Sequence, residues 1–310
     1  MIAEIIWTKP ALKILRVMLK GGEFAYYSAN ELAERTGLST PTVIETLNGL
    51  ISLNIVQRVK ATRKRYYFRI TPLNPVTPLI EEILDLVMKL EDRIIAMPLR
   101  HIDEVLGEEY YVGMYWAAMA NITPIDYSPR IYAVYTKKPQ WLLPLKASER
   151  IYVETEEYWD PKPNKEVYIA VIPVKEFPYD LTVADIQGEE ARVASIERGI
   201  AQTFKARIYP PYAATLALLQ NKDMNRIDEE KMERIATEEG SLPIIKAVAW
   251  LAERILEGQI FDKLSKDVEK TDQKPKIVWG PEPTITLKTM GTVVAIDPKP
   301  IEDAVTAVYG

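Results

Sequence analysis

Residues 28–70 constrain the fold more than any other stretch of this 310-residue chain, because their apolar spacing and turn residues fit one arrangement. Gly37 marks a turn between two helical patterns, and Ser39 offers a side-chain oxygen that can cap the helix after the turn. After this turn, apolar residues recur with the spacing of one helical face: Val43, Leu47, Leu50 and Ile51. The stretch therefore predicts two helices joined by a short turn.

Two helices joined in this way form the helix-turn-helix motif, whose second helix places its N-terminal residues in the major groove of DNA. The residues at the start of this predicted helix carry hydroxyls and one carboxylate, and we expect them to face DNA: Ser39, Thr40, Thr42, Glu45 and Thr46. Glu45 does not fit easily, because phosphates repel a carboxylate unless it accepts a hydrogen bond from a cytosine amino group.

A basic segment follows the second predicted helix. No acidic residue occurs between Glu45 and Glu81, whereas six Lys and Arg residues do, in a chain whose formal net charge is −5. β-prone runs at residues 56–59 and 66–70 flank a cationic tip, which predicts a two-stranded wing. We expect the wing to contact DNA phosphates through five of its cations: Arg58, Lys60, Arg63, Lys64 and Arg65.

Composition narrows the classes of function. The chain has no cysteine and one histidine, which excludes disulfides, Cys/His zinc sites and histidine-dependent triads. Glycine-rich phosphate loops and the nucleophile elbow of hydrolases are also absent from the sequence. We therefore expect no catalytic residues, no cofactor and no metal. No run of eighteen apolar residues and no secretory leader are found, so we expect a cytoplasmic protein without a membrane span.

Three prolines within residues 71–78 mark a domain boundary. Apolar residues then recur at near-heptad spacing over residues 79–97: Leu79, Ile83, Leu86, Leu90, Ile94 and Met97. This seam either pairs two chains in a homodimer or packs against the chain's own second domain, and the sequence does not decide between the two.

The remaining chain mixes strand and helix patterns. Residues 109–121 predict a buried helix, and strands are expected at 130–136, 150–155 and 166–173 and near residues 182 and 191. Helices are expected at 196–204, 211–219, 228–238 and 244–256, followed by a charged linker at 263–276, a hairpin at 277–296 and a terminal helix from residue 300. Asp180, Asp185, Glu189 and Glu190 lack metal-ligand spacing and indicate a solvated sheet edge.

We therefore predict an α+β protein: an N-terminal winged helix-turn-helix followed by a mixed α/β domain with a helical C-terminal part. The predicted domains are the winged helix-turn-helix at 1–75, a connecting and possibly dimerising helix at 76–108, an α+β domain at 109–270, and a hairpin with a short helix at 271–310.

Three segments in this order resemble the AbiE-type abortive-infection antitoxins, which are type IV toxin–antitoxin regulators with winged helices. They are the predicted winged helix, the segment at 110–120 with the strand after it, and the sequence Val-Ala-Ser-Ile-Glu-Arg at 193–198. The first two match that family's tendency to follow a "YYVSL.SAL" pattern with a strand, and the third matches its "vaSpER" turn. The sequence departs from the family at Gly199 and Gln202, where Thr and then Asp are frequent.

The resemblance implies an autorepressing, antitoxin-like transcriptional regulator that binds double-stranded operator DNA as a dimer and is paired with a nucleotidyltransferase-like toxin. It implies the antitoxin character of the domain at 109–270. Two alternatives stay open. One is a winged-helix module that binds protein instead of specific DNA, motivated by Glu45, and the other is an enzyme whose pocket lies in the tyrosine-rich sheet.

Overall fold

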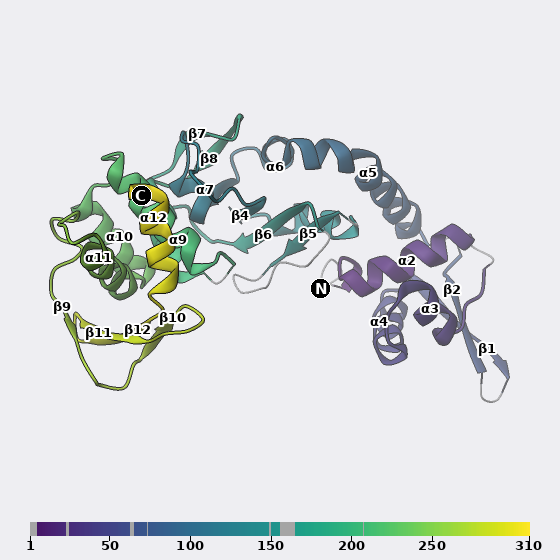
Figure 1. Ribbon diagram of the computed structural model, residues 1–310. Coiled ribbons are helices and arrows are strands. Elements are labelled where there is room, and N and C mark those ends of the chain that lie inside the picture. Colours follow the sequence, from purple (N-terminus) through teal and green to yellow (C-terminus); the bar gives the residue numbers. More distant parts are fainter. Residues whose placement is uncertain are drawn as a thin grey trace. The chain divides into compact units, whose positions relative to one another are not determined.

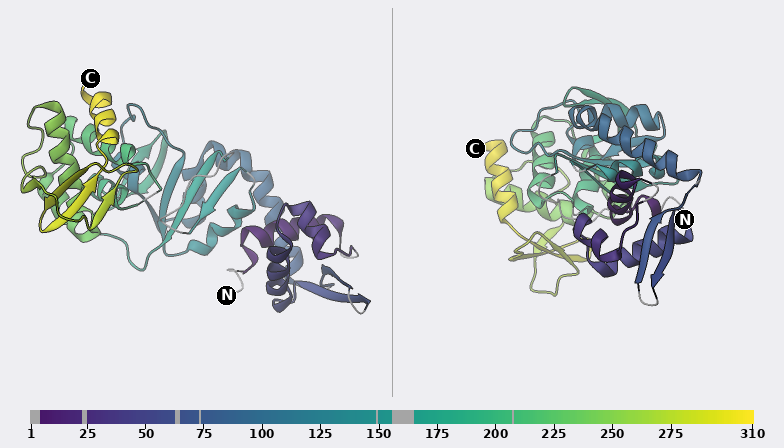
Figure 2. Two further views of the ribbon diagram at one scale, coloured as in Figure 1. Left: turned by 60° about the horizontal axis from the view of Figure 1, so that its bottom comes forward. Right: turned by 90° about the vertical axis from the view of Figure 1, so that its right-hand side faces the viewer.

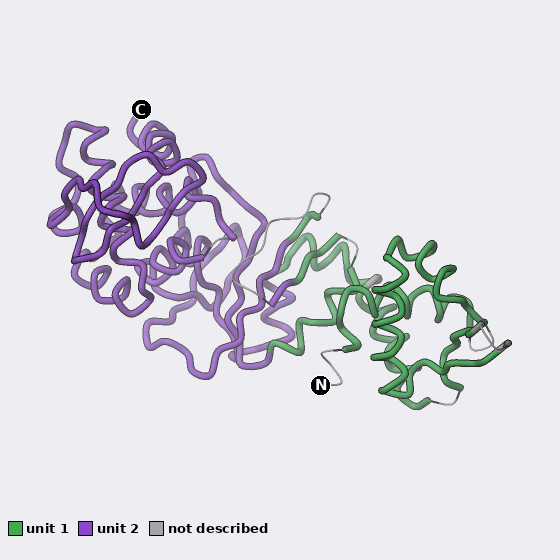
Figure 3. The backbone as a smooth tube through the Cα atoms, turned by 90° about the horizontal axis from the view of Figure 1, so that it is seen from below, with its two compact units in different colours: residues 1–98, 139–153, 164–167 green, residues 99–138, 154–163, 168–310 purple. Residues whose placement is uncertain are grey.

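The structure, a computed structural model, describes residues 5–22, 25–62, 65–72, 74–148, 150–155, 165–206 and 208–310, without the side chains of residues 61, 62, 65 and 88. It is a mixed α+β protein, as the sequence predicts. The chain forms two compact units (Figure 3). Unit 1 comprises residues 1–98, 139–153 and 164–167, and unit 2 comprises residues 99–138, 154–163 and 168–310.

From residue 9 onward, unit 1 contains three helices followed by a two-stranded sheet (Figure 1). These elements are α2 (Lys9–Gly21), α3 (Ala29–Thr36), α4 (Thr40–Ser52), β1 (Val56–Thr62) and β2 (Arg65–Ile70). Ser28 caps α3 by accepting a hydrogen bond from the Glu31 N–H, and Ser39 caps α4 by accepting one from the Thr42 N–H. Gly37 ends α3 with φ 68°, a conformation that glycine adopts without steric cost. The predicted capping and turn are confirmed.

The sheet of unit 1 is antiparallel, and its base is buried against the helices. Val56 pairs with Ile70 in the register of the sheet, and both side chains are buried. Tyr27, just before α3, forms a bridge with Phe68 and so attaches the sheet to the helices. The core beneath comes mainly from α2, α3 and α4: Leu12, Ile14, Leu15, Met18, Leu32, Val43, Leu47 and Leu50.

Unit 1 continues with α5 (Val76–Ala96) and receives a segment from later in the chain. One face of α5 joins the unit 1 core through Ile80, Leu84 and Val87. The later segment contains the short helices η1 (Pro139–Trp141) and η2 (Leu143–Ala147) and most of β5 (Ile151–Glu154). Its Ala147 belongs to the same core.

Unit 2 is built on a mixed sheet. Neighbouring strands in this sheet follow the order β6 (Val167–Pro173), β4 (Ile131–Thr136), β3 (Tyr110–Gly113), β8 (Glu189–Val193) and β7 (Thr182–Ile186). β4 runs antiparallel to β3 and parallel to β6. All six residues of β4 are buried, as expected for a central strand covered on both faces. Five longer helices accompany the sheet: α8 (Ile196–Lys205), α9 (Pro211–Asp223), α10 (Glu229–Glu239), α11 (Leu242–Leu256) and α12 (Lys299–Tyr309). α6 (Pro98–Leu106) precedes β3.

The prediction of one buried helix at 109–121 is wrong in part. The segment is buried, but it forms strand β3 and then the short helix α7 (Met114–Ala118). β3 pairs with β4 and, at Val112, with Val193 of β8, so partners remote in sequence decide its conformation. A Cβ at Gly113 would lie 2.4 Å from the Tyr135 ring, and Met114 has φ 54°, so the backbone changes direction there.

The C-terminal prediction also needs correction. β11 (Ile285–Thr289) and β12 (Thr292–Ile296) form the expected hairpin, but β10 (Ile277–Trp279) runs parallel to β12. The expected charged linker contains a further strand, β9 (Val268–Lys270), which pairs with β11. The small sheet has the order β10-β12-β11-β9 and appears in yellow-green near α12 in Figure 2.

No helix in the described ranges combines the length and the hydropathy needed to cross a bilayer.

Candidate nucleic-acid interface

The exposed face of α4 differs from the one expected from the sequence. Val43, Leu47 and Leu50 are buried, as predicted. The side chains that point away from this core recur at positions i, i+3, i+4 and i+7: Pro41, Ile44, Glu45 and Asn48 are all exposed. Of the five residues expected to read bases, Ser39 and Glu45 are exposed, whereas Thr40, Thr42 and Thr46 are only half-exposed.

The hydroxyls of these residues already have partners close by. The Thr46 hydroxyl donates to the backbone oxygen of Thr42 at 2.7 Å, and the hydroxyls of Ser39 and Thr42 lie 2.7 Å apart. Thr40 donates to Asn30 Oδ1 at 3.4 Å. The bonds of Ser39, Thr42 and Thr46 are local ones that are common for Ser and Thr at helix starts, whereas the bond of Thr40 reaches Asn30 of α3.

Sequence reasoning therefore missed Ile44 and Asn48. Ile44 is 44% exposed, although it is a large apolar residue in a helix whose other face is fully buried. Both residues lie on the side of the helix away from the buried stripe Val43, Leu47 and Leu50. Their exposure could therefore be predicted, because exposed positions on an amphipathic helix follow the same 3.6-residue period.

Arg58 connects α4 to the β1–β2 hairpin. Its Nη2 donates to Asn48 Oδ1 at 2.8 Å, and its guanidinium lies over the rings of Tyr66 (5.4 Å) and Phe68 (6.0 Å). In the sheet register Arg58 is opposite Phe68 and Lys60 is opposite Tyr66, so both cations share one face of the hairpin. Lys60 and Tyr66 are exposed. Arg58 and Lys60 thus lie on the hairpin face that is joined to the exposed side of α4.

The rest of the cationic wing is described in part. Arg63 and Lys64 lie outside the described residues, as does the side chain of Arg65. Arg69, which pairs with Gln57 in the register, lies on the opposite face of the hairpin from Arg58. It donates to Gln57 Oε1 at 3.0 Å and to the Tyr26 hydroxyl at 3.0 Å. The structure therefore brings two of the five expected phosphate contacts, Arg58 and Lys60, onto a common surface with α4.

The near-heptad seam on α5 is exposed over most of its length. Leu79 is 58% exposed and Leu86 is 49% exposed, while Ile83 and Leu90 are half-exposed. Ile94 is buried, so it does not belong to the exposed part of the seam. Ile80, Leu84 and Val87 belong to the unit 1 core and Ile83 packs against it, so Leu79, Leu86 and Leu90 are the seam residues that lie outside this core. We call Leu79, Leu86 and Leu90 the α5 stripe.

Unit 2 contains a buried polar network at the start of α8, where the sequence resembles antitoxins. Ser195 caps α8 by accepting from the Arg198 N–H, and the Ser195 hydroxyl lies 2.5 Å from Asp180 Oδ2. The Arg198 side chain, 8% exposed, pairs with Asp180 at 2.8 Å and with Glu239 at 2.8 Å. Burial lowers the pKa of the Arg198 guanidinium, but hydrogen bonds to Asp180 and Glu239 outweigh this effect and raise it. The network therefore keeps its charges and stabilises the junction of α8 with its neighbours.

The two departures from the antitoxin pattern both lie in this tightly packed region. A Cβ at Gly199 would lie 2.4 Å from the backbone N of Ala118, so only glycine permits this approach of α8 to α7. Gln202 Oε1 accepts from the Met114 N–H at 3.2 Å, and its Nε2 donates to the Tyr111 hydroxyl at 3.4 Å. Both residues therefore have structural roles in this chain.

The expectation of a solvated edge at residues 180–190 is wrong for Asp180. Its side chain is 5% exposed because it pairs with Arg198. Asp185 accepts from the Gly188 N–H at 3.1 Å and so stabilises the turn between β7 and β8, whereas Glu189 accepts from the Arg100 N–H at 2.8 Å in the first turn of α6. Among the residues that the structure describes, no group of three or more acidic, histidine or cysteine side chains could hold a metal ion.

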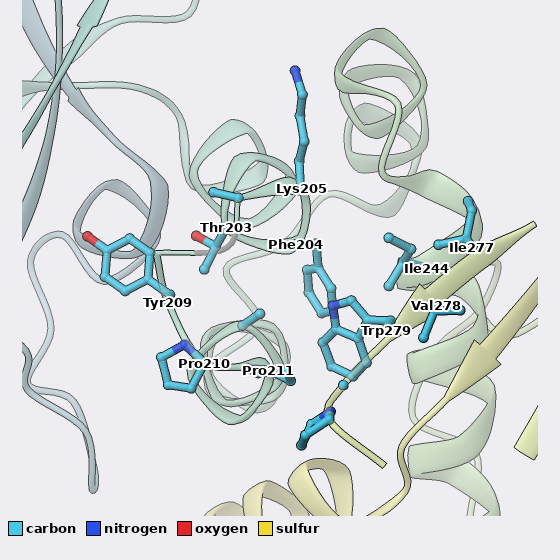
Figure 4. A pocket seen from close by; sticks show the side chains of 14 residues that line it. Thr203, Phe204, Lys205, Tyr209, Pro210, Pro211, Ile244, Ile277, Val278 and Trp279 are labelled. Carbon is cyan, nitrogen blue, oxygen red and sulfur yellow. The ribbon is translucent and has the colours of Figure 1, made fainter. Parts of the chain in front are cut away.

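A cavity of about 930 Å³ lies in unit 2, between α8, the start of α9 and β10 (Figure 4). Phe204 and Trp279 stack inside it with ring centroids 5.5 Å apart, and Pro210 and Pro211 line another side. Lys205 extends away from these rings in Figure 4 and reaches Glu239 at 4.0 Å. Among the lining residues that the structure describes there is no acid and no nucleophile placed beside a base, so we assign no reaction to this cavity.

Comparisons of the chain with protein-family models, with curated proteins and with solved structures find no match.

Proposed function

We propose that residues 28–70 form a winged helix-turn-helix and that the protein is a cytoplasmic DNA-binding transcriptional regulator without enzymatic activity. The observation that carries the proposal is the common surface in unit 1. The exposed face of α4 is joined through Asn48 and Arg58 to a hairpin with six cations in a stretch that has no acidic residue. An exposed helix beside a basic antiparallel hairpin matches the chemistry of major-groove and phosphate contact.

The salt dependence of DNA binding tests the phosphate contacts. If four to six of the six cations neutralise phosphates, the logarithm of affinity falls with the logarithm of salt concentration with a slope of about −4 to −5. The measurement is fluorescence anisotropy with genomic fragments that the protein selects, including its own upstream region. A slope near zero, or undiminished binding after Arg63→Ala, Lys64→Ala and Arg65→Ala are combined, would contradict the proposal.

We further propose that the regulator acts as a homodimer through the α5 stripe, because two winged helices on two half-sites contact more DNA than one. Autorepression and a functional pairing with a nucleotidyltransferase-like toxin are proposals that depend on the resemblance at residues 110–120 and 193–198.

A second candidate function is a protein-binding module, and the exposure of Ile44 beside Glu45 favours it. An exposed isoleucine next to a carboxylate suits a protein surface better than a phosphate backbone. Ile44→Ala separates the two functions. If α4 binds DNA, the variant has lower affinity for thymine-containing sites and unchanged nonspecific DNA binding. If the unit binds protein instead, neither the wild type nor the variant binds DNA.

A further inference from the structure

The hydrogen bond between Arg58 and Asn48 determines which atoms of the Asn48 side chain can contact a ligand. Arg58 Nη2 donates to Asn48 Oδ1 at 2.8 Å, and both residues are exposed. A guanidinium carries only N–H donors and no acceptor, so the amide atom that faces it must be the oxygen. The orientation of the Asn48 amide therefore follows from the chemistry of its partner.

The hairpin holds Arg58 in this position. Its guanidinium lies over two aromatic rings, 5.4 Å from the centroid of the Tyr66 ring and 6.0 Å from that of the Phe68 ring. Phe68 is 7% exposed and belongs to the unit 1 core, so packing fixes one of the two rings. Contact with aromatic faces and the planar shape of the guanidinium together restrict the arginine. Arg58 therefore fixes the Asn48 oxygen from a defined place on the hairpin.

Asn48 lies on the exposed face of α4, one helical turn after Ile44. The oxygen and the nitrogen of its amide diverge from one carbon atom. Because Oδ1 is directed to Arg58, Nδ2 is directed away from it. Asn48 thus offers the two N–H donors of Nδ2 on the face that α4 presents, while its acceptor is held by the hairpin.

This orientation changes which base an asparagine suits. Asparagine commonly contacts adenine, with its oxygen accepting from N6 and its nitrogen donating to N7. That contact needs both amide atoms to face the base, but Asn48 Oδ1 faces Arg58. Guanine presents the two acceptors O6 and N7 at the same edge, which match the two N–H donors of Nδ2. The amino group of adenine would instead place donors against donors.

We propose that Asn48 recognises guanine in the major groove and that Arg58 sets this preference by holding the Asn48 oxygen. The inference rests on the proposed DNA binding and names the base that this surface recognises. The other N–H donors of Arg58 can contact a phosphate at the same time. Asn48 contacts the base, and Arg58 is a positioning residue.

The test compares the base preference of the full-length wild type with those of single variants. Binding sites are first selected from duplexes with a random core. Fluorescence anisotropy then measures affinity for duplexes that carry each base pair at the position where Asn48→Ala abolishes the preference. The wild type is expected to bind the guanine duplex about tenfold more tightly than the adenine duplex, and Asn48→Ala is expected to bind all four alike.

Arg58→Met removes the donor to Asn48 and keeps an unbranched side chain beside the two rings. Since Oδ1 is then free, the preferred base at this position is expected to change from guanine to adenine. Arg58→Lys, whose Nζ can still donate to Oδ1, is expected to keep guanine. Lys60→Met is the matched control, because Lys60 is a cation on the same hairpin face, opposite Tyr66. It is expected to weaken binding to every duplex and to keep guanine.

Three results would overturn the inference and leave the proposed DNA binding intact. The first is that Asn48→Ala changes no base preference, and the second is that Arg58→Met still prefers guanine. The third is the same change of base in Lys60→Met, which would assign the change to lost charge and not to the released oxygen. Failure of the proposed function gives a different result. A wild type that is folded by circular dichroism, selects no duplex and shows no salt-dependent binding would overturn both.

Discussion

Glu45 is the residue whose charge fits the proposed DNA surface least. It is exposed on the same face of α4 as Asn48, which contacts Arg58. A carboxylate that faces phosphate or a base other than cytosine costs affinity, and a mismatch at one base position typically costs about 1–3 kcal/mol. In our proposal Glu45 therefore lowers the affinity for most DNA sequences and so contributes to specificity.

We predict that Glu45→Gln raises affinity for random DNA by up to about fivefold and narrows the difference between specific and random DNA. Glu34→Gln, at an exposed position on α3, makes the same charge change away from α4 and serves as the control. Anisotropy titrations with both DNA types measure the effect. Weaker binding to all DNA would instead give Glu45 a role in the fold of the helix pair, and no change with either DNA would favour the protein-binding module.

Still at the residue scale, the sequence predicts the buried residues of α4 well and its exposed residues less well. The burial of Val43, Leu47 and Leu50 follows from helical periodicity alone. The half-burial of Thr42 and Thr46 does not, because it depends on hydroxyls that bond to the helix backbone or to a neighbouring hydroxyl. The residue type of Ile44 does not predict its exposure, because an apolar side chain is expected to be buried. Its exposure follows only from its position on the helix, away from the buried stripe.

Among the elements of unit 2, α10 is held to the segment after α11 by one buried carboxylate. Glu229 pairs with Lys222 of α9 at 2.6 Å and accepts backbone N–H groups of Asp262 (3.0 Å), Lys263 (2.7 Å) and Leu264 (3.1 Å). Burial raises the pKa of the Glu229 carboxyl, but these hydrogen bonds together outweigh burial and lower it below the usual 4.5. The ionised carboxylate is therefore the form that the folded state prefers.

The sign of the pH dependence follows from this lowered pKa. The contribution of Glu229 to stability is fully present above the pKa of the unfolded chain and is lost as pH falls through the lower pKa of the folded state. We predict that Glu229→Gln costs about 1–3 kcal/mol at neutral pH and flattens the loss of stability below pH 4.5. Urea unfolding over a pH series measures both effects. Glu230 is the neighbouring residue, and its side chain is 77% exposed. Glu230→Gln is therefore expected to change neither the stability at neutral pH nor its loss at low pH.

The whole molecule shows what local patterns cannot predict. Most strands and helices of unit 2 begin and end near the positions expected from periodicity. The assignment of residues 139–153 and 164–167 to unit 1 follows only from tertiary packing, such as that of Ala147 in the unit 1 core.

The quaternary prediction concerns the α5 stripe. Leu84 and Val87 belong to the unit 1 core, so α5 can remain attached there when the stripe is changed. Leu86 and Leu90 lie outside that core and follow Leu79 at heptad spacing, which suits packing against a second α5 in a homodimer. Leu86→Glu combined with Leu90→Glu should therefore give folded monomers, because burying four carboxylates at one dimer seam costs more than the apolar contact contributes.

Sedimentation at micromolar concentration measures the oligomeric state, and circular dichroism reports whether the variant is folded. Val183→Glu combined with Met224→Glu is the matched control, because both residues are exposed apolar residues of unit 2 and lie outside the stripe. The control is expected to sediment as the wild type does. A monomeric wild type would show that the stripe pairs no chains, whereas dimers of the stripe variant would show that the interface lies on another surface.

If the wild type is a dimer, the monomeric variant should also lose most of its affinity for an operator with two half-sites. It should still bind a single half-site, because the contacts of each α4 with DNA are unchanged and only the link between the two copies is lost.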